Sequence, residues 1–181
     1  VLICMSHLMI AAMLGISVFI FMLYYGILNK DFDGPFQTII GMLLSISLCG
    51  VWLVPALHGG LMSIDGEAVS EVMKSLTFPF TQTLNPMFRF KNIEIYYFGL
   101  SFMVVSVLGL FLSNRKSLPG FLTMITIFLG TTTAFVTILV KLPLNQLLWM
   151  MRFTPVAYAI FVTGIFMWKN ARRYLTIIIM F

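Results

Sequence analysis

Six strongly apolar runs fill most of this 181-residue chain, and its two ends cut the first and the last of them. The sequence opens at Val1 inside a run without an initiator Met, and the final run, 174–181, stops after eight residues. A helix needs about 20 apolar residues to cross the ~30 Å hydrocarbon layer of a bilayer. The pattern therefore predicts a piece of a larger protein that crosses a membrane several times.

The composition argues against a water-soluble fold. Hydrophobic residues make up 60% of the chain and charged residues only 9%, whereas a soluble domain carries about 25% charge. A chain of this length cannot hide so much apolar surface from water, so lipid must be the solvent. The net charge of +5 does not indicate nucleic-acid binding, because the basic residues lie in short loops beside the runs, where they set orientation.

Four complete spans are expected after the truncated first run. They cover residues 37–57, 95–112, 121–140 and 153–168. The runs are continuous rather than alternating, which predicts helices and not strands. We therefore expect an all-α, polytopic helical bundle, with residues 1–181 forming part of one integral membrane domain that also has short interfacial helices on its outer face.

Small residues recur at helical spacing inside two of these spans. The two sets are Gly41, Ser45 and Cys49 in one span, and Thr126, Gly130, Thr133 and Thr137 in another. Such stripes let helices approach closely. A polar pore lining is the alternative, but no ionisable residue lies deep in any complete span, as transport pathways usually require.

The loops between the spans alternate between two sides. One set comprises loops 29–36, 113–120 and 169–173, and the other comprises loops 58–94 and 141–152. The first set has six basic residues in short loops, and the second has five in longer ones. Under the positive-inside rule, the first set is cytoplasmic and the second external. The expected location is the cell membrane, with several passes.

Several polar side chains fall on the expected external side. His7 reaches it if about 20 residues are counted back from the end of the first run, and His58 opens loop 58–94. Asp65 is expected to cap an amphipathic helix over about 66–76, which also contains Glu67. These carboxylates suit the positive end of a helix dipole; the alternative is a base or ligand role, although no metal-ligand spacing is present. For His7 the alternative is an interfacial His bonded to a backbone carbonyl.

The second external segment combines cationic residues with a proline break. Arg152 shares a helix face with Asn145 and Trp149, and Pro155 follows soon after. Interrupted segments of this kind often lie at binding sites in membrane proteins. Arg152 is able to form a fork with a lipid phosphate, and Lys141 to add a point charge. Both residues are equally consistent with ordinary interfacial anchors that extend to the headgroups.

Three short segments carry a resemblance to a known family. They are Ser6-His7-Leu8, the Trp52-Leu-Val-Pro-Ala-Leu-His58-Gly-Gly stretch, and Pro143 followed by Leu-Trp149-Met-Met-Arg152-Phe. They resemble bacterial 6-pyruvoyl-tetrahydropterin-synthase-related membrane proteins, which are similar to YfhO-like proteins. The wider group resembles GT-C glycosyltransferases, which use a polyprenyl-phosphate-linked sugar on the outer face. The label implies no pterin chemistry, because nothing here resembles the metal-binding histidines of the soluble pterin enzyme.

The resemblance implies a role in cell-envelope assembly. Arg152 and Lys141 would hold a lipid phosphate, and His7 and His58 would face the same cavity. The resemblance implies no metal or cofactor besides the lipid-linked sugar donor, and the catalytic acid is expected upstream of Val1, so no catalytic residue is assigned. The partners expected are the bilayer and a polyprenyl-phosphate lipid. A transporter or flippase, or a non-catalytic scaffold, remains the alternative.

Overall fold

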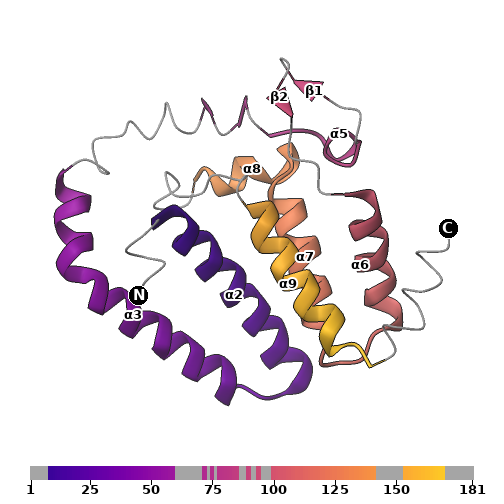
Figure 1. The fold of residues 1–181 in the computed structure, drawn as a ribbon, viewed down its shortest axis with the longest axis horizontal. Helices are drawn as coiled ribbons and strands as arrows, with labels where there is room; N and C mark the ends of the chain where they lie inside the picture. The colour runs from indigo at the N-terminus through magenta and orange to yellow at the C-terminus, as the bar shows by residue number, and fades with distance from the viewer. Residues whose placement is uncertain are drawn as a thin grey trace.

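The computed structural model describes residues 8–59, 71–72, 74–75, 77–85, 89–90, 93–94, 99–141 and 153–169. Within these ranges the elements are α2 (Leu8–Asn29), α3 (Asp33–Gly59), α5 (Phe80–Thr83), β1 (Arg89–Phe90), β2 (Ile93–Glu94), α6 (Leu100–Leu112), α7 (Leu118–Gly130), α8 (Thr133–Leu139) and α9 (Phe153–Met167). The two short strands pair antiparallel, and the bundle itself is helical (Figure 1). The all-α prediction is confirmed.

Among the described residues, two helices are long and apolar enough to cross a membrane. The qualifying segments are Ile10–Asn29 in α2 and Asp33–Val51 in α3, and only 17% and 11% of them, respectively, is buried inside the protein. They are therefore not core helices of a soluble fold. On α3, Leu48 and Val51 are 71% and 89% exposed, and an apolar surface of this kind requires lipid as its solvent.

The turn between these two helices follows from its sequence. Asn29 donates a side-chain hydrogen bond to the Tyr25 carbonyl at 3.1 Å, and Lys30 adopts a positive φ of 54°. A left-handed residue just after the last turn is a common way to end a helix. Asp31 Oδ1 then accepts the backbone N–H of Asp33 at 3.2 Å, and the charge of Asp33 suits the start of α3.

The shorter helices match the remaining predicted spans only in part. α9 agrees with the predicted span 153–168 to within one residue, and α6 begins at Leu100, while residues 95–98 lie outside the described ranges. α3 includes all of the predicted span 37–57 and continues past Pro55 to Gly59. The helix thus continues past Pro55 even though the proline has no N–H to donate to the Val51 carbonyl, so one helical hydrogen bond is missing there.

The predicted continuous span 121–140 is wrong. The helix is interrupted at Thr131 and Thr132, and α8 begins after them. The Thr132 hydroxyl and backbone N–H both bond the Leu129 carbonyl, at 2.6 and 3.0 Å. The N–H of Thr133 bonds the Phe78 carbonyl at 3.2 Å. Because the Thr133 N–H pairs outside the helix, the regular hydrogen-bond ladder stops there.

The centre of the bundle is α7, which packs against α9, α2 and α6. Its side chains Phe121, Met124 and Phe128 are completely buried. α7 and α9 approach each other closely at two glycines: a Cβ atom added to Gly120 would lie 2.6 Å from the Gly164 Cα atom. Only glycine fits at such a helix crossing, which is the packing that membrane helices use in the absence of a hydrophobic driving force.

The other contacts of α7 are also specific. A Cβ atom on Gly109 of α6 would lie 2.5 Å from the Phe121 ring, so that α6 also approaches closely. On the other side, the Tyr24 hydroxyl of α2 lies 2.8 Å from Thr126 Oγ1. The Thr126 hydroxyl donates to the Leu122 carbonyl at 2.9 Å, so Tyr24 is the donor of the interhelical bond.

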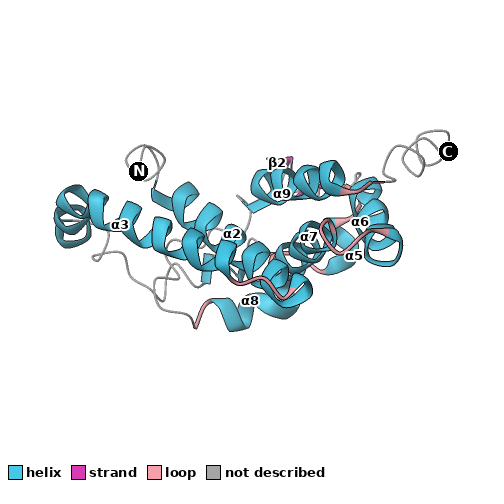
Figure 2. Cartoon of the chain, turned by 90° about the horizontal axis from the view of Figure 1, so that it is seen from below, coloured by secondary structure: helices cyan, strands magenta, loops and turns pink. Residues whose placement is uncertain are grey.

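The connections gather at two opposite ends of the bundle (Figure 1). The end that contains the α2–α3 turn, the α6–α7 turn and the end of α9 is called the lower end. The opposite end, which contains the start of α2, the end of α3, α5 and α8, is called the upper end. The described parts of loops 29–36 and 113–120 lie at the lower end and those of loop 58–94 at the upper end, as the predicted alternation requires (Figure 1). α3 packs on α2 and extends away from the other helices (Figures 1 and 2).

The predicted stripes of small residues pack only in part. A Cβ atom on Gly41 would meet nothing within 4 Å, although Cys49 on the same helix is buried. Thr133 and Thr137 are exposed, because α8 diverges after the break. The close contacts are made instead by Gly109, Gly120 and Gly164.

Replacement of Gly120 by Ala tests the α7–α9 crossing. We expect Gly120→Ala to lower the free energy of unfolding in mixed micelles by about 1–3 kcal/mol, because the added methyl meets backbone atoms that cannot move aside. Gly41→Ala is the matched control, and is expected to be neutral or stabilising by up to about 1 kcal/mol. Denaturant titration followed by circular dichroism measures both. Equal effects of the two variants would contradict the close crossing.

Candidate functional site

Two of the six residues predicted to form a site lie in the described part of the chain. His58 is exposed in the last turn of α3, and Lys141 is exposed just after α8. Both are at the upper end, but α3 ends away from α8 (Figures 1 and 2). The remaining four predicted residues, Arg152, His7, Asp65 and Glu67, lie outside the described residues. A shared cavity for Arg152, Lys141, His7 and His58 stays a prediction.

The described portion of loop 58–94 is attached to the break between α7 and α8. Phe78 is 8% exposed and forms a parallel bridge with Thr132, and the Phe80 and Phe128 rings pack edge to face at 5.4 Å. Among residues 77–85, only the four residues of α5 are helical. Of the predicted helix 66–76, the described residues Glu71, Val72, Lys74 and Ser75 are helical.

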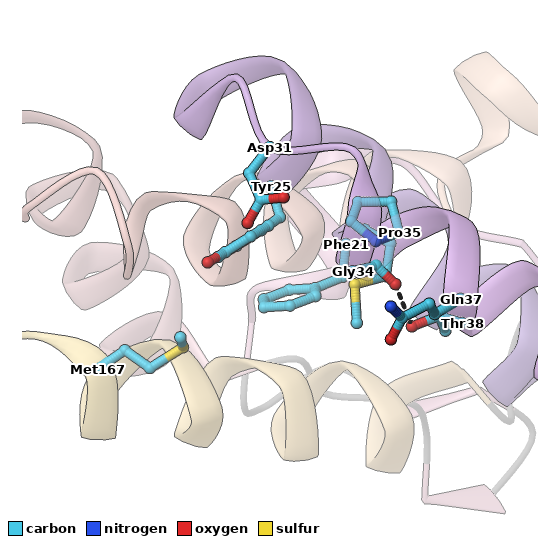
Figure 3. A pocket seen from close by; sticks show the side chains of 9 residues that line it. Phe21, Tyr25, Asp31, Gly34, Pro35, Gln37, Thr38 and Met167 are labelled. Atoms are coloured by element: carbon cyan, nitrogen blue, oxygen red, sulfur yellow. Dashed lines mark hydrogen bonds between the residues drawn. The ribbon is translucent and has the colours of Figure 1, made fainter.

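The described residues also form an open pocket at the lower end, with a volume of about 540 Å³. It lies between the last turns of α2, the α2–α3 turn and the end of α9 (Figure 3). Its lining consists of Phe21, Met22, Tyr25, Asp31, Gly34, Pro35, Gln37, Thr38 and Met167. We call it the lower pocket. Its size falls within the range of about 300–1,000 Å³ that is typical of small-molecule sites.

The lower pocket combines apolar walls with a few polar groups. The Phe21 and Tyr25 rings stack with centroids 6.4 Å apart, and Met167 approaches from α9 (Figure 3). The Thr38 hydroxyl is occupied, because it donates to the Gly34 carbonyl at 2.9 Å. The groups left for a ligand are the Asp31 carboxylate, the Gln37 amide and the Tyr25 hydroxyl.

Asp31 carries the one carboxyl group in the lining, which contains no Lys, Arg or His. One of its oxygens accepts the Asp33 N–H, and no cationic side chain of the described residues forms an ion pair with it. Sequence reasoning treated residues 29–36 as a plain cytoplasmic connection. The sequence signal for the lower pocket was the carboxylate of Asp31, which follows Tyr25 closely in the chain. The pocket also needs Met167, however, which is 136 positions further along the chain than Asp31 (167 − 31).

No metal site is found among the described residues at either end of the bundle. No group of three or more His, Cys, Asp or Glu side chains that would suit a metal ion lies among the described residues. The described residues place a charged group at each end: an exposed lysine at the upper end and a carboxylate in a partly aromatic pocket at the lower end.

Comparison with known families decides the broad class of the chain. Residues 1–181 match the 6-pyruvoyl-tetrahydropterin synthase related domain, a membrane protein. The chain belongs to this family. No curated protein and no solved structure matches. Membership confirms the resemblance at the level of the family, and it agrees with the exposed apolar surface of α3. The protein is thus a membrane protein in contact with a lipid bilayer.

The orientation of this family member in the membrane can be tested with two lysines. In a Cys4→Ser and Cys49→Ser background, we expect Lys141→Cys to react with a membrane-impermeant maleimide on intact cells, because the upper end is predicted to be external. Lys169→Cys, at the lower end, is expected to react only after the membrane is permeabilised. Gel-shift labelling measures both. Reaction of the two positions from the same side would contradict the topology.

Proposed function

We propose that this protein is a membrane glycosyltransferase of the GT-C type, or a close relative, that transfers a sugar from a polyprenyl-phosphate donor during assembly of the cell envelope. The support is the resemblance of its short motifs to that group, together with membership in a membrane-protein family. The structural observation that carries most weight is the position of Lys141, exposed at the end of α8. We expect this end of the bundle to face the outside.

The chemistry of such a transfer explains why a cation is needed there. The acceptor hydroxyl attacks the anomeric carbon of the sugar, the bond from that carbon to the phosphate oxygen breaks, and a base takes the hydroxyl proton. Negative charge therefore develops on the departing polyprenyl phosphate. A cation positioned at that phosphate lowers the barrier, because it stabilises charge that is greater in the transition state than in the substrate.

The break between α7 and α8 helps to position this cation. Continuous helix from α7 would carry residues 133–141 along the bundle axis, whereas α8 turns across its upper end (Figure 1). The Thr133 N–H bond to the Phe78 carbonyl holds the start of α8. Lys141 then follows the last turn of α8, where its flexible chain reaches a phosphate at headgroup level.

Removal of the Lys141 charge tests the proposal. In the full protein, we expect Lys141→Ala to reduce kcat/KM for sugar transfer from a polyprenyl-phosphate donor about tenfold, the effect of one charge-assisted hydrogen bond. Arg152→Ala is expected to act in the same direction. Lys169→Ala removes an exposed lysine at the lower end and serves as the control. Unchanged transfer in both upper-end variants would exclude these cations from the mechanism.

The same break favours a second candidate function, a transporter or flippase. Discontinuous membrane helices frequently line the substrate sites of transporters. The two functions differ in one measurement on the protein reconstituted in vesicles. Movement of a lipid-linked sugar across the bilayer without sugar transfer would support the flippase, and sugar transfer to an acceptor would support the enzyme. If the protein is a scaffold, neither activity is expected and Lys141→Ala affects only complex assembly.

A further inference from the structure

The lower pocket lies at the end of the bundle opposite to the proposed sugar-transfer site. We propose that it binds the primary ammonium group of an aminophospholipid, such as phosphatidylethanolamine. The inference is independent of the proposed glycosyltransferase activity, because it rests on other residues and on another face of the molecule.

The charge of the pocket indicates a cationic ligand. Asp31 has one carboxylate oxygen bonded to the Asp33 N–H, and the second has no hydrogen-bond partner among the described residues. Its neighbours in the lining include the Phe21 and Tyr25 rings, whose faces attract cations. The Asp31 carboxylate is exposed in this open pocket, where a cation can reach it and form a charge-assisted hydrogen bond. A purely anionic headgroup would instead be repelled.

The polar groups favour a primary over a quaternary ammonium. An –NH₃⁺ group has three hydrogen-bond donors. Asp31 and the Tyr25 hydroxyl lie near each other in the lining, and the Gln37 amide lies further along it, beside Thr38 (Figure 3). Neither Gln37 nor Tyr25 uses its side-chain polar atoms in a hydrogen bond with another described residue. A trimethylammonium group has no N–H to donate and would leave these acceptors unsatisfied. Phosphatidylcholine is therefore expected to bind less well.

The position of the pocket favours a lipid over a soluble amine. It lies at the end of α2 and the start of α3, the two helices long enough to cross the membrane. Phe32 and Phe36, which flank the lining residues Asp31 and Pro35 in the sequence, are 59% and 64% exposed. A headgroup in the pocket would thus be continuous with acyl chains along these apolar surfaces. Lys30, exposed beside Asp31, is available to the lipid phosphate.

The test measures which lipids the intact protein retains. The purified full protein is delipidated in detergent, mixed with equal amounts of phosphatidylethanolamine, phosphatidylcholine and phosphatidylglycerol, and examined by native mass spectrometry. We expect phosphatidylethanolamine to be the main adduct. Asp31→Asn is expected to weaken its retention about tenfold, since a charge-assisted hydrogen bond is lost. The asparagine oxygen still accepts the Asp33 N–H, so the turn is preserved.

Asp33→Asn provides the matched control. It removes a carboxylate charge two positions after Asp31, and Asp33 does not line the pocket. It should retain the lipid as the unmodified protein does. Equal retention by Asp31→Asn, an equal loss in Asp33→Asn, or no preference among the three lipids would overturn the proposal. Soluble O-phosphoethanolamine distinguishes the source of the amine: if it displaces the lipid at equal concentration, the apolar surface contributes nothing and the lipid assignment is wrong.

Discussion

The contact between Gly120 and Gly164 is the constraint on which the rest of the bundle depends. Inside a membrane, burial of apolar side chains does not by itself hold helices together, because lipid is equally apolar. Close approach and good packing must replace it. The absence of side chains at these two positions brings α7 and α9 into backbone contact. It also places Phe121, Met124 and Phe128 in the centre, where they are completely buried. α2 and α6 then pack on the same helix.

The chain enters and leaves α7 in different ways, and this difference shapes the two ends of the bundle. At its lower end, Pro119 suits the first turn of a helix, and the chain enters the bundle directly. At its upper end, Thr131 and Thr132 bond back to carbonyls of the preceding turn, at 2.7 and 2.6 Å. The backbone beyond them is free to pair with Phe78. The resulting turn directs α8 across the upper end and leaves Lys141 exposed there, while the lower end keeps an open pocket with a carboxylate.

The sequence predicted the features that depend on long apolar runs. It located α3 and α9, the all-α class and the alternation of the loops, because continuous hydrophobicity is a strong local signal. The sequence did not predict the features that are determined by contacts between distant parts of the chain. Gly41 and Gly120 look alike in the sequence, yet only Gly120 meets another helix. The break at Thr132 depends on the hydrogen bond from the Thr133 N–H to the Phe78 carbonyl, 55 positions away (133 − 78), and the lower pocket depends on Met167. Of the predicted site, His58 and Lys141 lie at the upper end, and their role in a site stays a prediction.

A double-mutant cycle on Gly120 and Gly164 tests the central contact most directly. Free energies of unfolding in micelles would be measured for Gly120→Ala, Gly164→Ala and the double variant. If the two glycines meet each other, the first methyl already separates the helices, and the second costs less than it does alone. The expected coupling energy is about 0.5–3 kcal/mol, as for residues in direct contact. Strictly additive losses would show that the glycines act independently and would contradict the proposed crossing.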